Sequence, residues 1–266
     1  MKYKEVRVLH TAGAGVLLDL GKESLGIDLF SKDPQGLYPD TPQDLKRELM
    51  FWIEQGRIQT LVFTHSHGDH FCLEDVLEAL HRNPKLRILS TEEVIRRIRE
   101  EEPHAGRLYT IASEEKSNQQ LEVPGFSLEV FNSRHMGREY SSVQNLVCMI
   151  QAAGMRILVP GDAWPEEELF VRVAKWSREI DLFLAPFPLI GIPTNRKILG
   201  KTLKIRQMFA LHLPRPEADS QGWLASAKAV CARAEDTLPM PVFGETPGKA
   251  YYFSKKHMNF EKNPLT

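Results

Sequence analysis

The chain has 266 residues and a mass of 30.4 kDa, and 42% of its residues are hydrophobic and 26% charged. Its 34 basic and 35 acidic residues leave a formal charge of −1, which argues against a protein that mainly coats nucleic acid or an anionic membrane. A chain of this length buries roughly 70–75% of the surface of its unfolded state, so it needs no disulfides to hold a core.

The cysteines and the amino terminus indicate the compartment. Cys72, Cys148 and Cys231 are odd in number and lack CxxC spacing, which fits neither a disulfide framework nor a cysteine-bound zinc site. The start of the chain lacks an apolar segment followed by a cleavage site, and no apolar run approaches the ~20 residues that span a bilayer. We therefore expect a cytoplasmic protein without a membrane partner.

The amino-terminal half begins with strand patterns and continues with strands and helices in alternation. Short alternating or apolar runs predict the strands, and apolar stripes at helical spacing predict the helices. The pattern predicts strands at 4–10, 14–20 and 24–30, a turn-rich segment at 31–42, a helix at 43–55, a strand at 60–64, a helix at 73–82, a strand at 86–90 and a helix at 91–101.

The second half repeats this organisation without repeating the sequence. No low-complexity tract or linker divides the chain, so we expect one compact α/β domain over residues 1–266, built from two strand-plus-helix halves. The pattern predicts strands around Pro124-Gly125, a hairpin of 143–151 and 155–160, a helix at 165–179, a strand at 181–186, an irregular stretch at 187–200, a strand at 207–212, a helix at 219–235, and turns with an edge strand at 240–253.

The heptapeptide THSHGDH at 64–70 carries the strongest chemical signal. It follows an apolar strand and precedes a helix. In an extended chain, residues two apart point the same way with Cα atoms about 6.6 Å apart, so His65 and His67 can bind one ion between them. The intervening glycine permits a bend, after which Asp69 and His70 can bind a second ion. Imidazole and carboxylate ligands suit zinc, and also iron or manganese.

Two other interpretations of this motif are weaker. A polar turn that is merely rich in histidine is improbable, because three of the nine histidines fall within six positions around an aspartate. An H-x-H pair also ends the first strand of many amidohydrolase TIM barrels. Here, however, 64 residues of strand and helix pattern precede His65, and that scheme gives the adjacent Asp-His no role.

The motif resembles the H-x-H-x-D-H signature of the metallo-β-lactamase-fold hydrolase superfamily. In that family a third histidine, a bridging aspartate and a final histidine follow downstream, and His135, Asp162 and His212 match them in order, each at a predicted strand end. Singly, they have simpler explanations as a loop histidine, a helix N-cap and a core histidine. Their order and positions together favour the ligand set.

The resemblance covers essentially the whole chain and implies a four-layer αββα sandwich of two mixed β-sheets flanked by helices. Two divalent ions would lie along one edge, with zinc expected and manganese or iron as alternatives. A bridging hydroxide would attack the substrate, with Asp162 and Asp69 as catalytic residues. The implied ligands are His65, His67 and His135 for the first ion, Asp69, His70 and His212 for the second, and Asp162 for both.

Three further residues lie outside these motifs in the sequence. Asp28 matches a strand-end aspartate that the family uses as a hydrogen-bonding partner behind the ligands, although a plain strand-end role fits equally well. His10 is a possible substrate contact. Cys72 follows the motif by two residues and is expected to be buried at a helix start rather than to bind metal.

Two groups of cations are candidate substrate contacts. The run from Arg196 to Arg206 contains no acidic residue, which suits a solvated helix face or a site that binds an anion beside the metals. We expect a small anionic substrate, such as a phosphorylated lactone or a phosphodiester, as in the similar ascorbate-6-phosphate lactonase-like proteins. The candidate contacts are Arg134, Arg138 and Tyr140 around His135, and Arg196, Lys197 and Lys201 in the acid-free run.

The sequence therefore predicts a metal-dependent hydrolase of an ester, lactone or phosphodiester, with alternatives in other classes. A ribonuclease Z-like nuclease would share the ligands but typically carries an extended substrate arm, and no insertion of that size is present. A glyoxalase II-like thioester hydrolase and a single-iron persulfide dioxygenase also fit the motif. A non-catalytic metal protein fits less well, because structural zinc sites are normally closed and four-coordinate. Nothing in the sequence indicates the oligomeric state.

Overall fold

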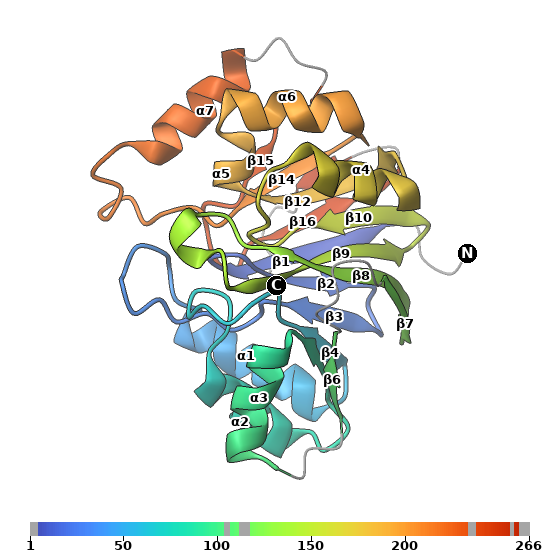
Figure 1. Cartoon of the computed structure of the whole chain (residues 1–266). Helices are drawn as coiled ribbons and strands as arrows, with labels where there is room; N and C mark the ends of the chain where they lie inside the picture. Colours follow the sequence, from blue (N-terminus) through green and yellow to red (C-terminus); the bar gives the residue numbers. More distant parts are fainter. Residues whose placement is uncertain (1–4, 104–106, 112–117, 234–237, 256–257, 261–266) are drawn as a thin grey trace.

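The computed structural model describes residues 5–103, 107–111, 118–233, 238–255 and 258–260, the last range as backbone only. Two mixed β-sheets pack face to face, and helices cover both outer surfaces, so the chain has four layers (Figure 1). This arrangement confirms the predicted αββα sandwich. Within the described ranges, no helix combines the length and the apolar character that crossing a bilayer requires.

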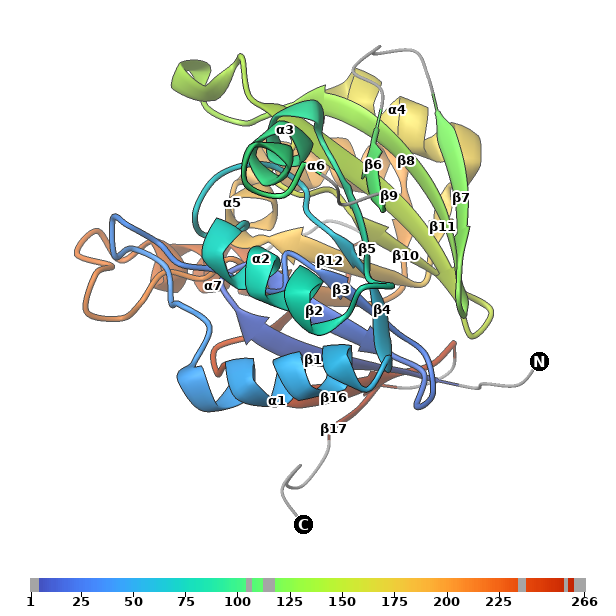
Figure 2. The same ribbon diagram turned by 90° about the horizontal axis from the view of Figure 1, so that it is seen from below.

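The first sheet has eight strands and carries three helices. Its elements are β1 (Val6–Ala12), β2 (Gly15–Asp19), β3 (Ser24–Ile27), α1 (Gln43–Glu54), β4 (Ile58–Val62), α2 (Leu73–Arg82), β5 (Arg87–Ser90), α3 (Glu92–Glu101), β6 (Leu108–Thr110), β16 (Ala250–Phe253) and β17 (Met258–Phe260). The strand order is β17-β16-β1-β2-β3-β4-β5-β6. Strands β3 to β6 are parallel, because a helix connects each to the next. Figure 2 shows these helices across the outer face of the sheet.

The second sheet has seven strands in the order β15-β14-β12-β10-β9-β8-β7, and a two-stranded sheet lies beside it. Strands β10, β12, β14 and β15 are parallel. The elements are β7 (Gln119–Val123), β8 (Phe126–Arg134), a 3-10 helix (Arg138–Tyr140), β9 (Gln144–Ala152), β10 (Met155–Val159), α4 (Glu167–Trp176), β11 (Glu179–Ile180), β12 (Leu182–Pro186), α5 (Phe187–Ile190), α6 (Pro193–Thr202), β13 (Lys204–Ile205), β14 (Met208–Leu211), α7 (Trp223–Arg233) and β15 (Val242–Phe243).

Strand β9 illustrates how the sequence forms the layers. Its successive side chains point to opposite faces of the sheet. Leu146, Cys148 and Ile150 pack between the two sheets, whereas Val147 and Met149 pack beneath the outer helices. Both faces are therefore buried, which explains why this strand is almost continuously apolar in the sequence.

Two predicted segments differ in the structure. The stretch predicted as irregular, 187–200, forms α5 and most of α6. Pro188 and Pro193 lie in their first turns, where the missing N–H has no helical partner and the fixed φ favours the helix. The predicted edge strand near the carboxyl terminus is instead an inner strand, because β16 pairs with β1 on one side and β17 on the other.

The topology brings distant segments to one edge of the sandwich. Strands β4, β8, β10 and β14 all end there, and their carboxyl ends lead directly into loops. In α/β sheets ligand sites form beyond the carboxyl ends of strands. This edge therefore positions every loop that carries a predicted metal ligand.

Candidate metal centre

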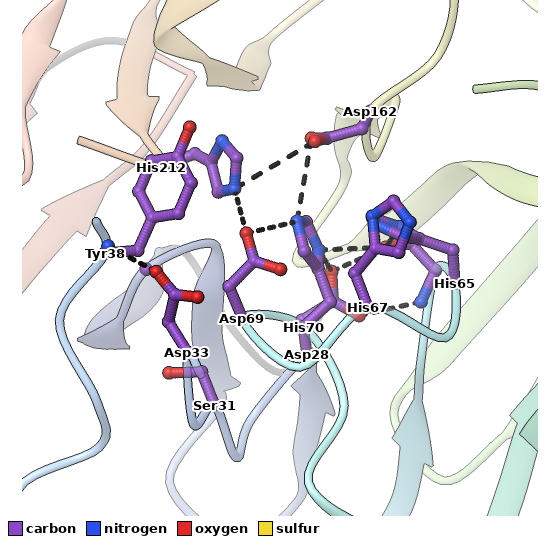
Figure 3. Close-up of polar contacts among 12 residues, drawn as sticks. Asp28, Ser31, Asp33, Tyr38, His65, His67, Asp69, His70, Asp162 and His212 are labelled. Carbon is purple, nitrogen blue, oxygen red and sulfur yellow. Dashed lines mark hydrogen bonds and ion pairs between the residues drawn. The ribbon is translucent and has the colours of Figure 1, made fainter. Parts of the chain in front are cut away.

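The loop between β4 and α2 places four of the predicted ligands. It turns tightly, because the backbone N–H groups of His70 and Phe71 both donate to the carbonyl oxygen of His67, at 3.0 and 2.8 Å. Gly68 is required at this turn, since a Cβ atom there would lie 2.6 Å from the carbonyl oxygen of Lys32. The bend turns the second half of the motif away from the first (Figure 3).

Three histidines form the first ligand group. The Nε2 atom of His65 lies 3.1 Å from Nδ1 of His67 and 3.2 Å from Nε2 of His135. Two nitrogens bound to one tetrahedral zinc at about 2.0–2.1 Å lie about 3.3–3.4 Å apart. The observed separations therefore suit one ion bound by all three rings.

Asp69, His70 and His212 form the second group. Nε2 of His212 lies 2.7 Å from Oδ2 of Asp69, and Nε2 of His70 lies 3.9 Å from the same oxygen. His212 has φ +58°, a left-handed conformation that is uncommon for this residue type. Its N–H donates to the carbonyl oxygen of Gly13 at 2.9 Å, which holds the backbone in that conformation.

Asp162 lies between the two groups. Its carboxylate is 3.7 Å from Nε2 of His135 in the first group and 3.7 Å from Nε2 of His70 in the second. Gly161 precedes it with φ +55°, and a Cβ atom there would lie 2.3 Å from Oδ1 of Asn145. That same oxygen accepts the N–H of Asp162 at 2.8 Å. The position of Asp162 is the one that the resemblance implies for a bridging ligand.

The site contains buried polar atoms that an additional group would satisfy. His70 is fully buried and Asp162 is 5% exposed, yet Nε2 of the first and Oδ1 of the second have no hydrogen-bond partner. Unpaired buried polar atoms are costly. Because both atoms face the other ligands, the seven side chains fit the two divalent ions that the resemblance implies.

Hydrogen bonds behind the ligands fix their orientation. The Asp28 carboxylate accepts the N–H and the hydroxyl of Thr64, both at 2.7 Å, and Nδ1 of His70 at 2.8 Å. A carboxylate only accepts, so Nδ1 of His70 donates and its Nε2 faces the ligand cluster. Nδ1 of His65 lies 3.1 Å from the oxygen of the Thr64 hydroxyl, so this ring too is held through its Nδ1 atom while its Nε2 atom faces the other ligands. Asp28 therefore supports the ligands from behind, the first of its two predicted roles.

The electrostatics of the ligand cluster favour cations. Burial lowers the pKa of His70, but the surrounding carboxylates of Asp162, Asp28 and Asp69 outweigh it and hold that pKa well above its ordinary value. Burial raises the pKa of Asp69, but the neighbouring imidazoles outweigh it and lower that pKa to about 2. Burial holds the pKa of His65 well below its usual value, which leaves the neutral ring that binds metal.

Sequence reasoning missed two residues of this site. Asn145 is fully buried inside β9 and also donates to the carbonyl oxygen of Pro160 at 2.8 Å, so it fixes the Asp162 loop from both sides. Tyr38 stacks on the ring of His212, with 3.8 Å between ring centroids. Neither position follows a periodic pattern in the sequence, and no motif marks them.

The candidate contacts around His135 lie beside the first ligand group. The Tyr140 ring packs edge-on to His67 and His135, with centroids 4.9 and 5.3 Å away. Arg134 and Arg138 line one pocket with Ser141 and Trp164. The structure therefore brings Tyr140 against the ligands, and Arg134 directly precedes His135 in the chain, while the roles of all three residues as substrate contacts stay predictions.

The second group of candidate contacts lies elsewhere. Arg196 is only 1% exposed and donates to the sulfur of Cys231 at 3.3 Å, so it does not lie on a solvated helix face, and its role as an anion contact stays a prediction. The side chain packs inward because α6 turns this face of the run into the core. Lys197 is exposed on α6, and Lys201 forms an ion pair with Glu167 at 2.7 Å. The roles of these two lysines stay predictions.

His10 and Cys72 lie behind the site. Nε2 of His10 is 3.2 Å from the carbonyl oxygen of Gly13, the group that also accepts the N–H of His212. His10 is 2% exposed and thus supports the His212 backbone rather than opening onto the ligand cluster. Cys72 is buried at the residue before α2, as expected.

The fold of this chain is similar to those of solved structures, several of which are described as metal-dependent hydrolases. The metallo-β-lactamase-fold protein YhfI from Bacillus subtilis matches with a TM-score of 0.62 at 14% identity, covering 94% of this chain and 99% of that chain. Igni18, a metallo hydrolase from the archaeon Ignicoccus hospitalis, matches with a TM-score of 0.61 at 16% identity, covering 94% and 99%.

A third matching structure is that of a protein described as containing two iron ions. CmlA, a diiron β-hydroxylase from Streptomyces venezuelae, matches with a TM-score of 0.62 at 12% identity, covering 95% of this chain and 54% of that chain. No protein-family model matches the sequence, and no curated protein is similar enough to count as a relative. The chain thus has the metallo-β-lactamase fold, with its candidate metal ligands at the edge formed by the strand ends.

Proposed function

We propose that this protein is a metal-dependent hydrolase that uses two divalent ions, with zinc preferred, to cleave an ester, lactone or phosphodiester of a small anionic molecule. The observation that carries the proposal is the convergence of seven ligand side chains into two groups with Asp162 between them. The same fold occurs in a diiron protein, so the fold alone does not select the metal.

Each residue of the candidate site has a proposed role in binding the ions or in the reaction. The first ion would be held by His65, His67 and His135, the second by Asp69, His70 and His212, and both by Asp162. When bound, such ions supply Lewis acidity and lower the pKa of a coordinated water toward neutrality. The Asp69 side chain retains 14% exposure, so its carboxylate would orient the attacking water by accepting a hydrogen bond from it.

The proposed anion contact is the pocket beside His135. Arg138 is exposed, and Arg134 lies over the Trp164 ring at 4.6 Å and 3.7 Å from Glu166. A guanidinium binds carboxylate or phosphate oxygens through two parallel N–H groups. We therefore place the anionic end of the substrate at these arginines.

Hydrolysis should depend on the ligand histidines and on metal. Protein loaded with zinc should hydrolyse one class in a panel of 4-nitrophenyl esters, phosphodiesters, lactones and thioesters, and a chelator should abolish the activity. His67→Ala should lower kcat/KM about a hundredfold or more, because it removes one of three ligands of the first ion. His81→Ala is the matched control, since His81 is a surface histidine beside Glu102. Loaded wild type inactive on the whole panel would contradict the proposal.

Arg138→Ala should weaken selection for a negative charge. The substrates are mono-4-nitrophenyl glutarate and 4-nitrophenyl valerate, whose acyl chains have equal length and differ in the terminal carboxylate. We expect kcat/KM to fall about tenfold for the glutarate and to stay unchanged for the valerate, the size expected of one charge-assisted hydrogen bond. Arg99→Ala, an exposed arginine on α3, should change neither. Equal losses for both esters would contradict an anion contact at Arg138.

A further inference from the structure

An apolar pocket adjoins the other end of the candidate metal site. Strand β12 lies between β10 and β14 in the parallel part of the second sheet. Its carboxyl end therefore lies between the loops that carry Asp162 and His212. Phe187 and Pro188 follow β12 directly as the first turn of α5 and form part of the pocket wall.

The lining of this pocket is uncharged and largely apolar. The cavity has a volume of about 400 Å³, within the range of small-molecule sites. Ile192 and Trp223 remain 46% and 45% exposed, although large apolar side chains normally gain by burial. The principal lining residues are Tyr38, Phe187, Pro188, Ile192, Trp223 and Ser226.

The walls of the pocket are held in place by the chain itself. The Asp219 carboxylate accepts the N–H groups of Trp223 and Leu224 at 2.7 and 2.9 Å, which fixes the start of α7. Gly191 allows α5 to approach α7, since a Cβ atom there would lie 2.6 Å from Cβ of Ala227. The pocket is therefore preformed.

Tyr38 connects this pocket with the ligand cluster. Its ring stacks on His212 with an interplanar angle of 24°, and it also lines the apolar pocket. Figure 3 shows Tyr38 and His212 at one end of the row of ligands, with His65 and His67 at the other. Tyr140 packs on His67 at that second end, and Arg138 and Arg134 precede Tyr140 in the same segment of the chain. The apolar pocket thus lies at the His212 end of the row of ligands, and the proposed anion contacts belong to the segment that carries His135.

We infer that the apolar pocket binds the hydrocarbon part of the substrate while the scissile bond lies at the metals. This inference rests on the proposed hydrolase function and narrows its substrate class to amphipathic molecules. Such a substrate carries a short alkyl or aryl group on the Tyr38–Trp223 side and a negative charge on the Arg134–Arg138 side. The absence of charged residues among those lining the pocket argues against a second ionic group there.

Binding of fatty carboxylates to zinc-loaded protein tests the inference without turnover. Acetate and hexanoate are titrated by calorimetry into wild type, Ser226→Trp and Ala225→Trp. Both replaced residues are exposed neighbours on α7, but only Ser226 lines the pocket. Wild type and the Ala225→Trp protein should bind hexanoate at least about tenfold more tightly than acetate, because each buried methylene strengthens binding about fourfold. Ser226→Trp fills the pocket, so this gain should shrink to about twofold or less.

The outcomes separate the inference from the function on which it rests. If hexanoate binds no more tightly than acetate to wild type, or equally well to both tryptophan variants, the inference is overturned even when the protein hydrolyses esters. If the chain-length effect appears and Ser226→Trp removes it, the inference is supported even when no panel substrate is cleaved. In that case the hydrolase proposal fails by itself.

Discussion

Replacement of Asp162 by asparagine is expected to lower kcat/KM for the best panel substrate about a thousandfold or more. The Asp162 carboxylate lies within 3.9 Å of Nε2 atoms of His70, His135 and His212, so it serves both ligand groups. Asparagine has nearly the same size but no charge, and its amide nitrogen cannot bind a cation. The change thus removes the negative charge and one of the two oxygens that a shared ligand needs, while preserving the packing. Steady-state kinetics on protein loaded with zinc give the result.

Asp181→Asn is the matched control for this variant. Asp181 is 1% exposed and precedes β12 at the opposite edge of the sheet, where it accepts the N–H of Arg156 at 2.8 Å. Its loss should lower the free energy of unfolding but leave kcat/KM per folded molecule within about twofold. If Asp162→Asn keeps its activity within tenfold of wild type, Asp162 does not have the shared role assigned to it.

Replacement of Asp28 by asparagine should weaken metal binding about 10–100-fold, the usual effect of losing a hydrogen bond behind a ligand. The Asp28 carboxylate accepts hydrogen bonds from Nδ1 of His70, which fixes the tautomer of that ring, and from the Thr64 hydroxyl. The backbone of Asp28 has φ +47°. Asparagine tolerates the left-handed conformation, so backbone strain stays nearly constant. The free energy of unfolding should also fall by about 2–4 kcal/mol, because a buried charge-assisted network is broken. Competition with a chromophoric chelator measures the affinity.

Asp19→Asn separates the loss of stability from the loss of metal affinity. Asp19 is also buried and bound by two arginines, Arg7 and Arg57, but it lies at the end of β2 farthest from the ligands. We expect the Asp19→Asn protein to have a lower free energy of unfolding than wild type and the same zinc affinity. Equal zinc affinity in wild type and Asp28→Asn would show that Asp28 does not support the ligands.

The sequence predicts most of the fold because its elements follow simple periodic patterns. Every ligand lies in a loop that follows an apolar strand ending at the site. The strand pattern and the motif therefore predict the same location for the ligands. The glycines at 68 and 161 stand where the chain must turn closely against backbone or against a side chain. Local sequence therefore contains most of the information that places the ligands.

The features that sequence reasoning missed depend on contacts between distant segments. Arg196 of α6 is buried against Cys231 of α7, α6 packs on α4 and α5, and α5 packs on α7, and no local pattern indicates these contacts. Asn145 interrupts an apolar strand, and its partners Pro160 and Asp162 lie in the loop after the following strand, β10. Tyr38 lies in a turn-rich segment without periodicity. These are the residues that position the site and shape its apolar pocket.

The measurement that tests the central claim most directly is the metal content of the chain. Protein purified without chelator is dialysed against zinc and then against buffer, and its zinc is counted by mass spectrometry. The account predicts two tightly bound equivalents per chain in wild type and fewer in His67→Ala, because the two ligand groups share only Asp162. Zinc near zero in wild type, or the same content in both proteins, would contradict it.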